Sequence, residues 1–413
     1  MFPSHSHSTR RSFLKSSAVG SAVLTFGGVA PSPLIRAAEE SQAGRILVVI
    51  EMAGGNDGLN TVIPSADEAY KKSRPALAIK PSDVLNIGEG LGFHPELRGF
   101  ADLLEAGKLA IVQGVGYSDP NRSHFESMDI WHTCQRKNEV RADGWLGRMV
   151  ESRKNAPGSD PAAIHLGSEK QPFALMSRNV RVPSIRTLEQ FRLQGTDDVA
   201  FRKAVQELAD ARRGEDNDLL NFVQSSTSSA ISASERLSTS LKSYRSSVKY
   251  PENALGQQLK TVAQLIGSGL QTSVYYVQLG GFDTHSQQPA VHAALLGQLG
   301  DSVKAFLSDL EQMQHADRVS VMTFSEFGRR VAENASEGTD HGAAGPMFIA
   351  GAAVRSGLVG RHPDLNDLEE GDLKHHTDFR RVYATLIEKW FGCDSSAILK
   401  AIYEPLELFS DKA

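Results

Sequence analysis

The chain has 413 residues, with 49 acidic and 44 basic side chains and a formal net charge of −5. This mild acidity gives no field that would favour nucleic acid or an anionic membrane surface, so we expect neither partner. After the first forty residues, no run approaches the roughly 18 apolar residues of a membrane-spanning helix, and we expect no stable membrane span. Cys134 and Cys393 are the only cysteines, and their distant positions leave open whether they pair.

The N-terminal segment has the order of an export signal. Arg10 and Arg11 precede a Gly-, Ala- and Ser-rich stretch at residues 17–30, which is too short and too polar to span a bilayer permanently. Small residues close to position 38 offer a cleavage point. We therefore predict a removable twin-arginine signal at residues 1–38, recognition by the twin-arginine translocase, and a periplasmic or secreted mature protein.

Short apolar runs bounded by glycine or polar residues recur along the rest of the chain, and each has the length of a buried strand. The predicted strands are residues 45–52, 108–114, 273–279, 318–324 and 346–351. Helical patterns occur at residues 95–107 and 290–313, and a further helix is predicted at residues 379–391. This alternation predicts one α/β domain over residues 44–408, with a mostly parallel sheet and helices on both faces.

Residues 188–267 differ from the rest of the domain. They are polar, rich in Ser, Ala, Gln and Lys, and almost without strand signal, so we predict a helical insertion. Apolar positions within residues 216–246 fit one long amphipathic helix or a pair of helices. A cap, an interaction surface and a packed solvent-facing hairpin are all compatible with this pattern.

Acidic and histidine residues follow several predicted strands. In open α/β sheets, ligands bind beyond the carboxyl ends of the strands. Asp57 lies in a glycine-rich turn after the first strand, whereas Asp283 and His285, two residues apart in an extended segment, point to the same side and suit one cation. Asp340 and His341 share a glycine-flanked loop where both side chains can turn toward one ion. Turn formation by the aspartates and a hydrogen-bonded histidine are the structural alternatives.

A second candidate feature lies after the predicted strand at residues 108–114. Ser123 is at a predicted helix start, where backbone N–H groups and the helix dipole favour an anionic oxygen. This position suits a nucleophile or an oxyanion site. A capping box, with Ser123 at the N-cap and Glu126 at N3, explains the same residues structurally. Arg122 beside it is a candidate bidentate donor to a substrate anion.

Five short motifs stand out after the signal. They are residues 54–60 (GGNDGLN), 121–125 (NRSHF), 280–285 (GGFDTH), 325–329 (SEFGR) and 339–342 (TDHG). Together with the twin-arginine start, these motifs resemble the exported bacterial proteins of domain-of-unknown-function family 1501. That family is similar to the alkaline phosphatase and sulfatase superfamily. The resemblance covers nearly the whole mature chain and implies an alkaline-phosphatase-like α/β fold, one or two divalent metal ions, and hydrolysis of a small anionic ester of phosphate or sulfate.

The resemblance also implies roles for individual residues. Asp57 matches the superfamily's first metal aspartate, and Ser123 matches its nucleophile at a helix start. Asp283 and His285 match the next ligand pair, although the superfamily pattern spaces that Asp and His more widely.

A further departure follows the strand at residues 318–324, where the superfamily places an adjacent Asp and His. Either Glu326 replaces the aspartate and His341 supplies a distant imidazole, or Asp340 and His341 take the whole role. Zinc, calcium, magnesium and manganese all remain compatible with these ligands. The alternative function is a non-catalytic exported protein that uses the same fold to bind a metal or a glycan.

Overall fold

The computed structural model describes residues 44–153, 160–186, 203, 207 and 244–410. The predicted signal at residues 1–38 and most of the predicted insertion at residues 188–267 lie outside these ranges, so both stay predictions. No helix among the described residues is long and apolar enough to cross a membrane.

A nine-stranded sheet forms the centre of the described part. Its strands are β1 (Ile46–Ala53), β5 (Leu109–Gly116), β6 (Ala163–Leu166), β7 (Ser184–Ile185), β8 (Val274–Gly280), β9 (Val319–Phe324), β10 (Gly345–Ala350), β11 (Gly357–Val359) and β14 (Thr377–Asp378). Their order is β11-β5-β10-β9-β1-β8-β6-β7, and β14 also pairs with β5. Only β10 runs antiparallel to its neighbours β5 and β9. The predicted mostly parallel sheet is therefore confirmed, and all five predicted strands belong to it.

Strand β1 lies between β8 and β9 and is parallel to both. Ile46, Val48 and Ile50 belong to the core on one face of the sheet. Leu47 and Val49 belong to the core on the other face. Both faces are covered, which explains why this strand is a continuous apolar run rather than an alternating one.

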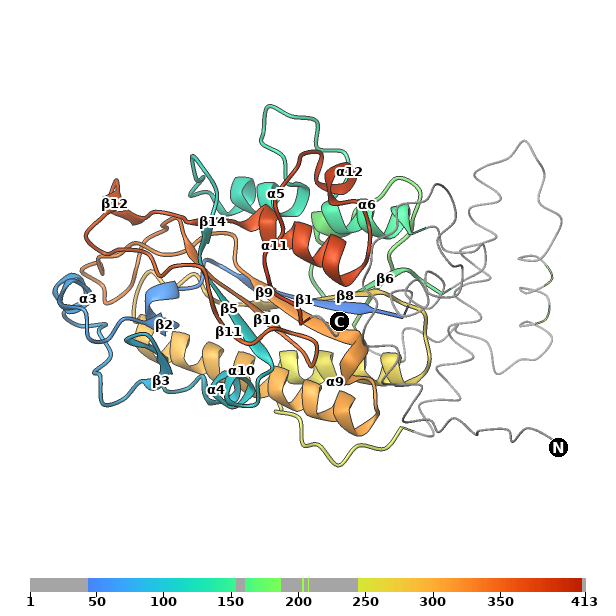
Figure 1. Cartoon of the computed structure of the whole chain (residues 1–413), viewed down its shortest axis with the longest axis horizontal. Helices are drawn as coiled ribbons and strands as arrows, with labels where there is room; N and C mark the ends of the chain where they lie inside the picture. Colours follow the sequence, from blue (N-terminus) through green and yellow to red (C-terminus); the bar gives the residue numbers. More distant parts are fainter. Residues whose placement is uncertain (1–43, 154–159, 187–202, 204–206, 208–243, 411–413) are drawn as a thin grey trace, which may run out of the picture. The chain divides into compact units, whose positions relative to one another are not determined.

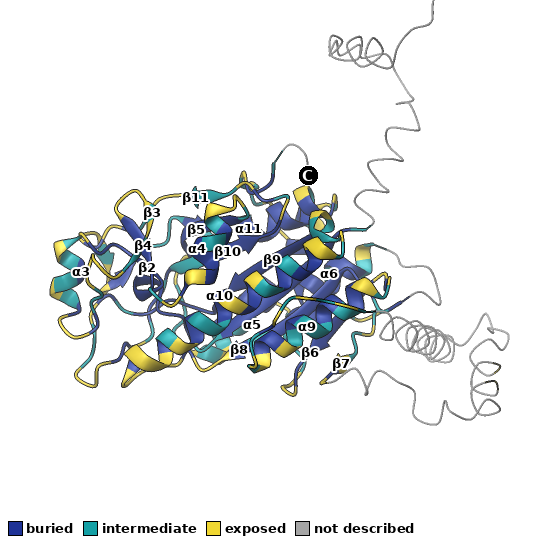
Figure 2. Cartoon of the chain, turned by 90° about the horizontal axis from the view of Figure 1, so that it is seen from below, coloured by how far each residue is buried: buried dark blue, intermediate teal, exposed yellow. Residues whose placement is uncertain are grey.

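Two layers of helices cover the sheet (Figure 1). One layer contains α4 (Arg98–Glu105), α9 (Ala254–Gly267) and α10 (Gln288–Gln312), and the other contains α5 (His124–Thr133), α6 (Trp145–Ser152), α11 (Phe379–Thr385) and α12 (Ser395–Leu399). Figure 2 shows the first layer lying across the sheet with exposed residues on its outer side. The α9 helix falls within the range of the predicted insertion and packs in the same core as α4 and α10.

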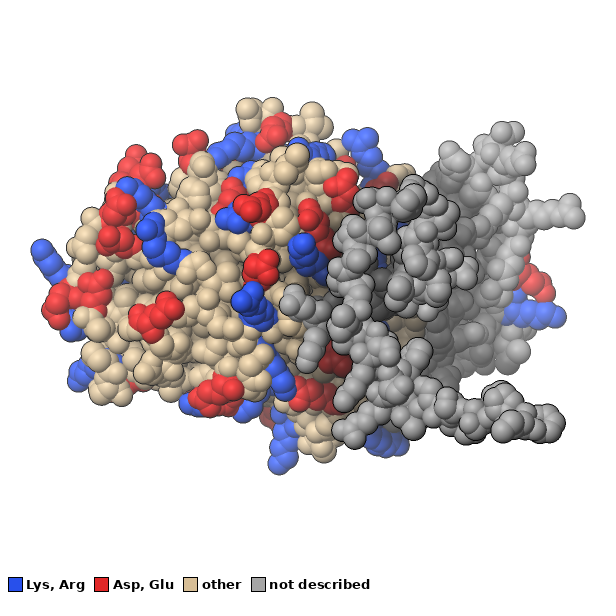
Figure 3. Space-filling view, in the orientation of Figure 1, with Lys and Arg blue, Asp and Glu red and all other residues tan. Residues whose placement is uncertain are grey.

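Smaller elements surround the sheet. They are the antiparallel strands β2 (Val62–Ile63), β3 (Leu85–Gly88) and β4 (Leu91–Phe93), the hairpin of β12 (Leu368–Glu369) and β13 (Asp372–Leu373), the helix α3 (Glu68–Ser73), and the 3-10 turns η1 (Gly58–Asn60), η2 (Phe173–Leu175) and η4 (Ala316–Arg318). The predicted C-terminal helix at residues 379–391 consists of α11 followed by the π-helical turn η5 (Leu386–Trp390). Figure 3 shows basic and acidic side chains interspersed over the described part of one face.

The two cysteines do not pair with each other. Cys134 is buried at the end of α5, Cys393 is partly exposed, and both are free. Burial raises the pKa of the Cys134 thiol to about 12, which makes it an unreactive core residue.

Candidate functional site

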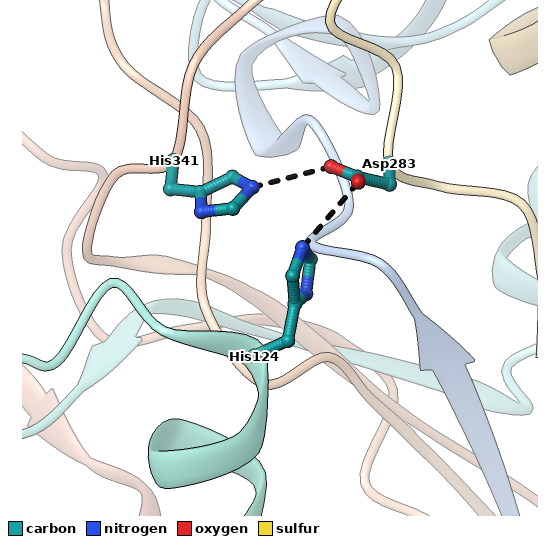
Figure 4. A group of neighbouring side chains, drawn as sticks. All are labelled: His124, Asp283 and His341. Atoms are coloured by element: carbon teal, nitrogen blue, oxygen red, sulfur yellow. Dashed lines mark hydrogen bonds and ion pairs between the residues drawn. The ribbon is translucent and has the colours of Figure 1, made fainter.

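Loops at one edge of the sheet bring histidine and acidic side chains together. His124 is the first residue of α5, after β5, while Asp283 and His285 follow β8. Glu326 follows β9, and His341 lies between β9 and β10. One donor atom each from His124, Asp283 and His341 lie within 4.8 Å of one another (Figure 4).

Glu326 fixes the orientation of the His124 ring. Its Oε1 lies 2.7 Å from His124 Nδ1, and this hydrogen bond is the main cause that raises the pKa of His124. Because a carboxylate accepts, Nδ1 carries a proton and the neutral ring presents a lone pair at Nε2. That Nε2 is buried without a hydrogen-bond partner and lies 3.4 Å from Asp283 Oδ2.

The other two histidines are held in the same way. His341 Nδ1 lies 2.7 Å from the carbonyl oxygen of Arg122, and His285 Nδ1 lies 3.1 Å from Asp340 Oδ1. Since both partners only accept, each ring places its Nε2 lone pair toward Asp283, at 3.2 Å for His341 and 3.1 Å for His285. The two Nε2 atoms are themselves 2.9 Å apart.

Three imidazole lone pairs and a carboxylate would repel one another in the absence of positive charge. Protons on the rings or a cation between them would relieve this repulsion. A donor set of imidazole nitrogens and one carboxylate oxygen fits a divalent transition metal, above all zinc. In metal sites the second ring nitrogen is usually hydrogen-bonded to a carboxylate or a carbonyl, as it is in all three rings here. The residues present therefore fit a metal ion.

The buried side chain of Arg329 holds the loops around this centre. It donates to the carbonyl oxygens of Gly55 at 2.7 Å and Thr339 at 2.8 Å, and to Asp283 Oδ1 at 2.7 Å. Burial alone would raise the pKa of Asp283, but the hydrogen bond from Arg329, together with the neighbouring His341, lowers it to about 2. Asp283 is thus ionised at neutral pH.

Gln288, the first residue of α10, links the same loops through its buried side-chain amide. Its Oε1 accepts hydrogen bonds from the hydroxyls of Thr284 at 3.0 Å and Thr339 at 2.6 Å. Its Nε2 donates to Asp57 Oδ2 at 2.5 Å. One buried amide therefore connects the loop that carries Asp283 to the loop that carries His341.

Asp57, a predicted metal ligand, occupies a different environment. It is buried and forms an ion pair with Arg74 at 2.6 Å. Burial would raise the pKa of Asp57, but the Arg74 charge holds it below its usual value. In the described part of the chain, no hydrogen bond or ion pair joins Asp57 to the three histidines, so the structure does not bring it into the cluster.

Two further predicted ligands lie beside the cluster. Glu326 and Asp340 each contact the Nδ1 atom of a histidine, on the side of the ring away from Asp283. Of the predicted metal residues, Asp283 and His341 form the candidate metal group with His124, and His285 lies beside them with its Nε2 3.1 Å from Asp283 Oδ1.

Ser123 and Arg122 lie at the beginning of α5. Ser123 is exposed at the N-cap and makes no capping hydrogen bond, while Glu126 pairs with Arg141 at 2.5 Å. The capping-box interpretation was therefore wrong. Arg122 donates to Asp372 at 2.5 Å, so its guanidinium is already engaged.

A groove of about 450 Å³ opens beside the cluster. His124, Asp283 and Glu326 line it on the side of the candidate metal centre. Phe125 and Met128 of α5 also line it, and the backbone after β8 contributes glycines. The groove gives a small molecule access to the donor atoms.

Sequence reasoning missed His124, Arg329 and Gln288. Two of these lie inside the quoted motifs NRSHF and SEFGR, so the signal was present but was assigned to the neighbouring Ser123 and Glu326. Gln288 has no such signal, because a buried amide at a helix start looks like any polar residue in sequence.

A family model comparison agrees with these motifs. The model described as a protein of unknown function (DUF1501) matches residues 113–402. The chain belongs to this family. A comparison with curated proteins gives no significant match.

Three proteins are among the solved structures that match this chain in backbone fold. The sulfatase PsFucS1 from Pseudoalteromonas sp. shares 10% identity over 91% of this chain and 73% of its own, with a TM-score of 0.41. The zinc complex of the C-terminal periplasmic domain of EptC from Escherichia coli shares 9% identity over 76% of this chain and 74% of its own, with a TM-score of 0.37. A protein of the alkaline phosphatase superfamily from Vibrio parahaemolyticus shares 7% identity over 82% and 73%, with a TM-score of 0.34. At such TM-scores the likeness says nothing about the chemistry of this site.

Proposed function

We propose that the protein is an exported metal-dependent hydrolase of phosphate or sulfate esters, built as one domain over residues 44–408 with a helical insertion at residues 188–267. The observation that supports a metal ion is the convergence of three imidazole Nε2 atoms on Asp283. Each of the three rings is fixed by a hydrogen bond at its Nδ1. The nitrogen-rich donor set favours zinc over calcium or magnesium, which prefer oxygen ligands.

A divalent ion held by His124, Asp283, His285 and His341 would supply Lewis-acid polarisation of the ester and a lowered pKa for its nucleophile. The chain contributes the remaining functions. Glu326 keeps a proton on Nδ1 of His124, so that Nε2 keeps the lone pair that would bind the metal ion. Ser123 is the candidate nucleophile, since its hydroxyl is exposed one residue before His124 and at a helix start that favours a developing anion.

The proposal includes export through the twin-arginine translocase to the periplasm or beyond. Its support is the order of Arg10, Arg11 and the weakly apolar stretch at residues 17–30. Folding before export would allow metal loading in the cytoplasm, which suits ligands that come from three separate loops.

Metal content and turnover test the proposal together. Purified mature protein is analysed for bound metal and assayed on chromogenic phosphate and sulfate esters, with and without a chelator. Asp283→Ala should lose both metal and turnover, whereas the matched surface variant Asp367→Ala should retain both. Turnover that survives Ser123→Ala would assign the attack to water instead of the serine. Turnover that is unaffected in Asp283→Ala would reject the proposed centre.

One observation favours the second candidate, a non-catalytic metal- or glycan-binding protein. Arg122 is engaged by Asp372, and no Lys or Arg is among the described residues that line the groove. Hydrolases of anionic esters commonly use such cations to bind the substrate's charge. Stoichiometric metal without turnover on any ester would support this second function.

A further inference from the structure

The groove beside the candidate metal centre has an apolar wall that the metal itself does not explain. Phe125, the second residue of α5, is 88% exposed and lines the groove. The Phe125 ring contributes almost nothing to the core. Met128, one turn further along α5, is partly buried and packs against the core. An exposed aromatic ring that lines a groove offers a face on which a ligand ring can stack.

Glycine backbone forms another part of the groove. Gly280 and Gly281 line it, and neither presents a side chain. A Cβ added at Gly280 would meet nothing within 4 Å, so the space above this backbone is open. With a volume of about 450 Å³, the groove has room for a ring beside Phe125.

The charges of the groove limit what it can hold. Its ionisable lining residues are His124, Asp129, Asp283 and Glu326, and no Lys or Arg accompanies them in the described lining. Arg329 lies nearby but is fully buried and hydrogen-bonded to Asp283. Asp129 likewise pairs with Arg141 at 3.5 Å, and Arg141 does not line the groove. A ligand that carried negative charge along this groove would therefore meet carboxylates and find no Lys or Arg of the described lining to pair with.

We propose that this groove binds the leaving group of the substrate, and that the leaving group is an uncharged ring that stacks on Phe125. The inference rests on the proposed function, because it places the anionic ester at the cluster and the rest of the substrate along α5. The two chemical sources are an aryl alcohol and a sugar, which share a ring with an apolar face. A leaving group with its own phosphate or carboxylate is excluded by the same reasoning.

Non-hydrolysable ligands test this directly. Zinc-loaded protein is titrated calorimetrically with methylphosphonate and with phenylphosphonate, which carry the same charge and differ in the ring. We expect phenylphosphonate to bind about tenfold more tightly, the value of one stacking contact. Phe125→Ala should remove most of that difference and leave the affinity for methylphosphonate unchanged. Val140→Ala, at another exposed apolar residue, is the matched control.

Two further ligands complete the experiment. Carboxyphenylphosphonate should bind more weakly than phenylphosphonate because of the groove carboxylates. A hexosyl phosphonate in place of the phenyl compound identifies the source: tighter binding assigns a sugar, and weaker binding assigns an aryl group. Equal affinities for methyl- and phenylphosphonate, or a Phe125→Ala variant that behaves like wild type, would overturn the inference.

Binding of phenol alone separates this inference from the proposed function. If methylphosphonate does not bind, the ester-binding centre is rejected, but phenol still reports on the groove. Chemical-shift changes with phenol that weaken in Phe125→Ala and not in Val140→Ala support the ring site. Phenol binding that is unchanged in Phe125→Ala contradicts it.

Discussion

Glu326 decides which nitrogen of His124 faces the centre. The carboxylate accepts hydrogen bonds from His124 Nδ1 at 2.7 Å and from the backbone N–H of Gly54 at 2.9 Å. It is 1% exposed, so little water competes for these bonds. A buried carboxylate of this kind raises the basicity of the ligand and fixes its tautomer.

Replacing Glu326 by Gln should therefore weaken metal binding without removing a ligand. The amide keeps the size of the side chain but loses the charge that supports the Nδ1 proton. We expect the zinc affinity to fall roughly tenfold, the lower end for partners of metal-binding histidines. Chelator competition measures it, with Glu105→Gln on the exposed face of α4 as control. An affinity equal to wild type would show that His124 does not bind the metal through Nε2.

The buried histidine of α10 makes stability depend on pH. His292 is 1% exposed, and its Nε2 lies 3.0 Å from Asn56 Oδ1. Burial lowers the pKa of His292 from 6.5 to about 4. Between pH 6.5 and pH 4 the unfolded chain binds a proton at His292 that the folded chain does not. The contribution of the neutral His292 to the free energy of unfolding is therefore fully present above pH 6.5 and is lost as the pH falls toward 4.

Urea unfolding at pH 7 and pH 4.5, with chelator present, tests this effect. The free energy of unfolding should fall by about 2–3 kcal/mol more in wild type than in His292→Gln, since each pKa unit is worth about 1.4 kcal/mol. Gln retains a donor for Asn56 but does not titrate. Equal losses in the two proteins would contradict a neutral buried His292.

At the scale of elements, the loop after β1 must approach the loop after β8 very closely. Gly54 has a φ of +119°, and a Cβ on it would lie 2.4 Å from the backbone nitrogen of Asp283. Such a contact is impossible without displacing one of the loops. Only glycine permits both this backbone conformation and this approach.

Gly54→Ala should therefore disturb the centre through the backbone. We expect a loss of about 2 kcal/mol or more in the free energy of unfolding, together with weaker zinc binding, because Asp283 is displaced. Gly280→Ala is the matched control, since its Cβ would meet nothing within 4 Å. Urea unfolding and chelator competition measure both effects. Normal zinc affinity in Gly54→Ala would show that the two loops move independently.

The elements were more predictable than the site. Strand β1 is apolar from Ile46 to Ile50 because both of its faces are covered, and that pattern is visible in sequence. The antiparallel direction of β10 was not predictable, since a buried strand has the same composition in either direction. The structure brings Asp283, His285 and His341 together, and their role as metal ligands stays a prediction. Asp57 also follows a strand, but it forms a buried ion pair with Arg74. No sequence pattern predicted that Arg74 would lie beside Asp57.

At the scale of the molecule, the centre connects three loops that are distant in sequence. The donor atoms come from His124, Asp283, His285 and His341, which lie after β5, after β8 and between β9 and β10. An ion bound only by the folded chain stabilises it by mass action. At an ion concentration of 100 times Kd, this amounts to about 2.7 kcal/mol.

Removal of metal by a chelator should therefore lower the Tm by several degrees, roughly 5 °C for a domain of this size. Differential scanning calorimetry of zinc-loaded and chelator-treated protein measures the shift. Asp283→Ala, which should not bind the ion, should melt at the same temperature under both conditions. A comparable shift in that variant would place the stabilising ion elsewhere.

The sheet order has a consequence for biosynthesis. Strand β5 is flanked by β10 and β11, which are made more than 200 residues later, and β14 joins it later still. On the ribosome, β5 therefore waits with both edges open until almost the entire polypeptide has emerged. Such unpaired edges invite association with other nascent chains. We expect a chaperone to shelter this segment until release, so that the sheet closes only after translation has finished.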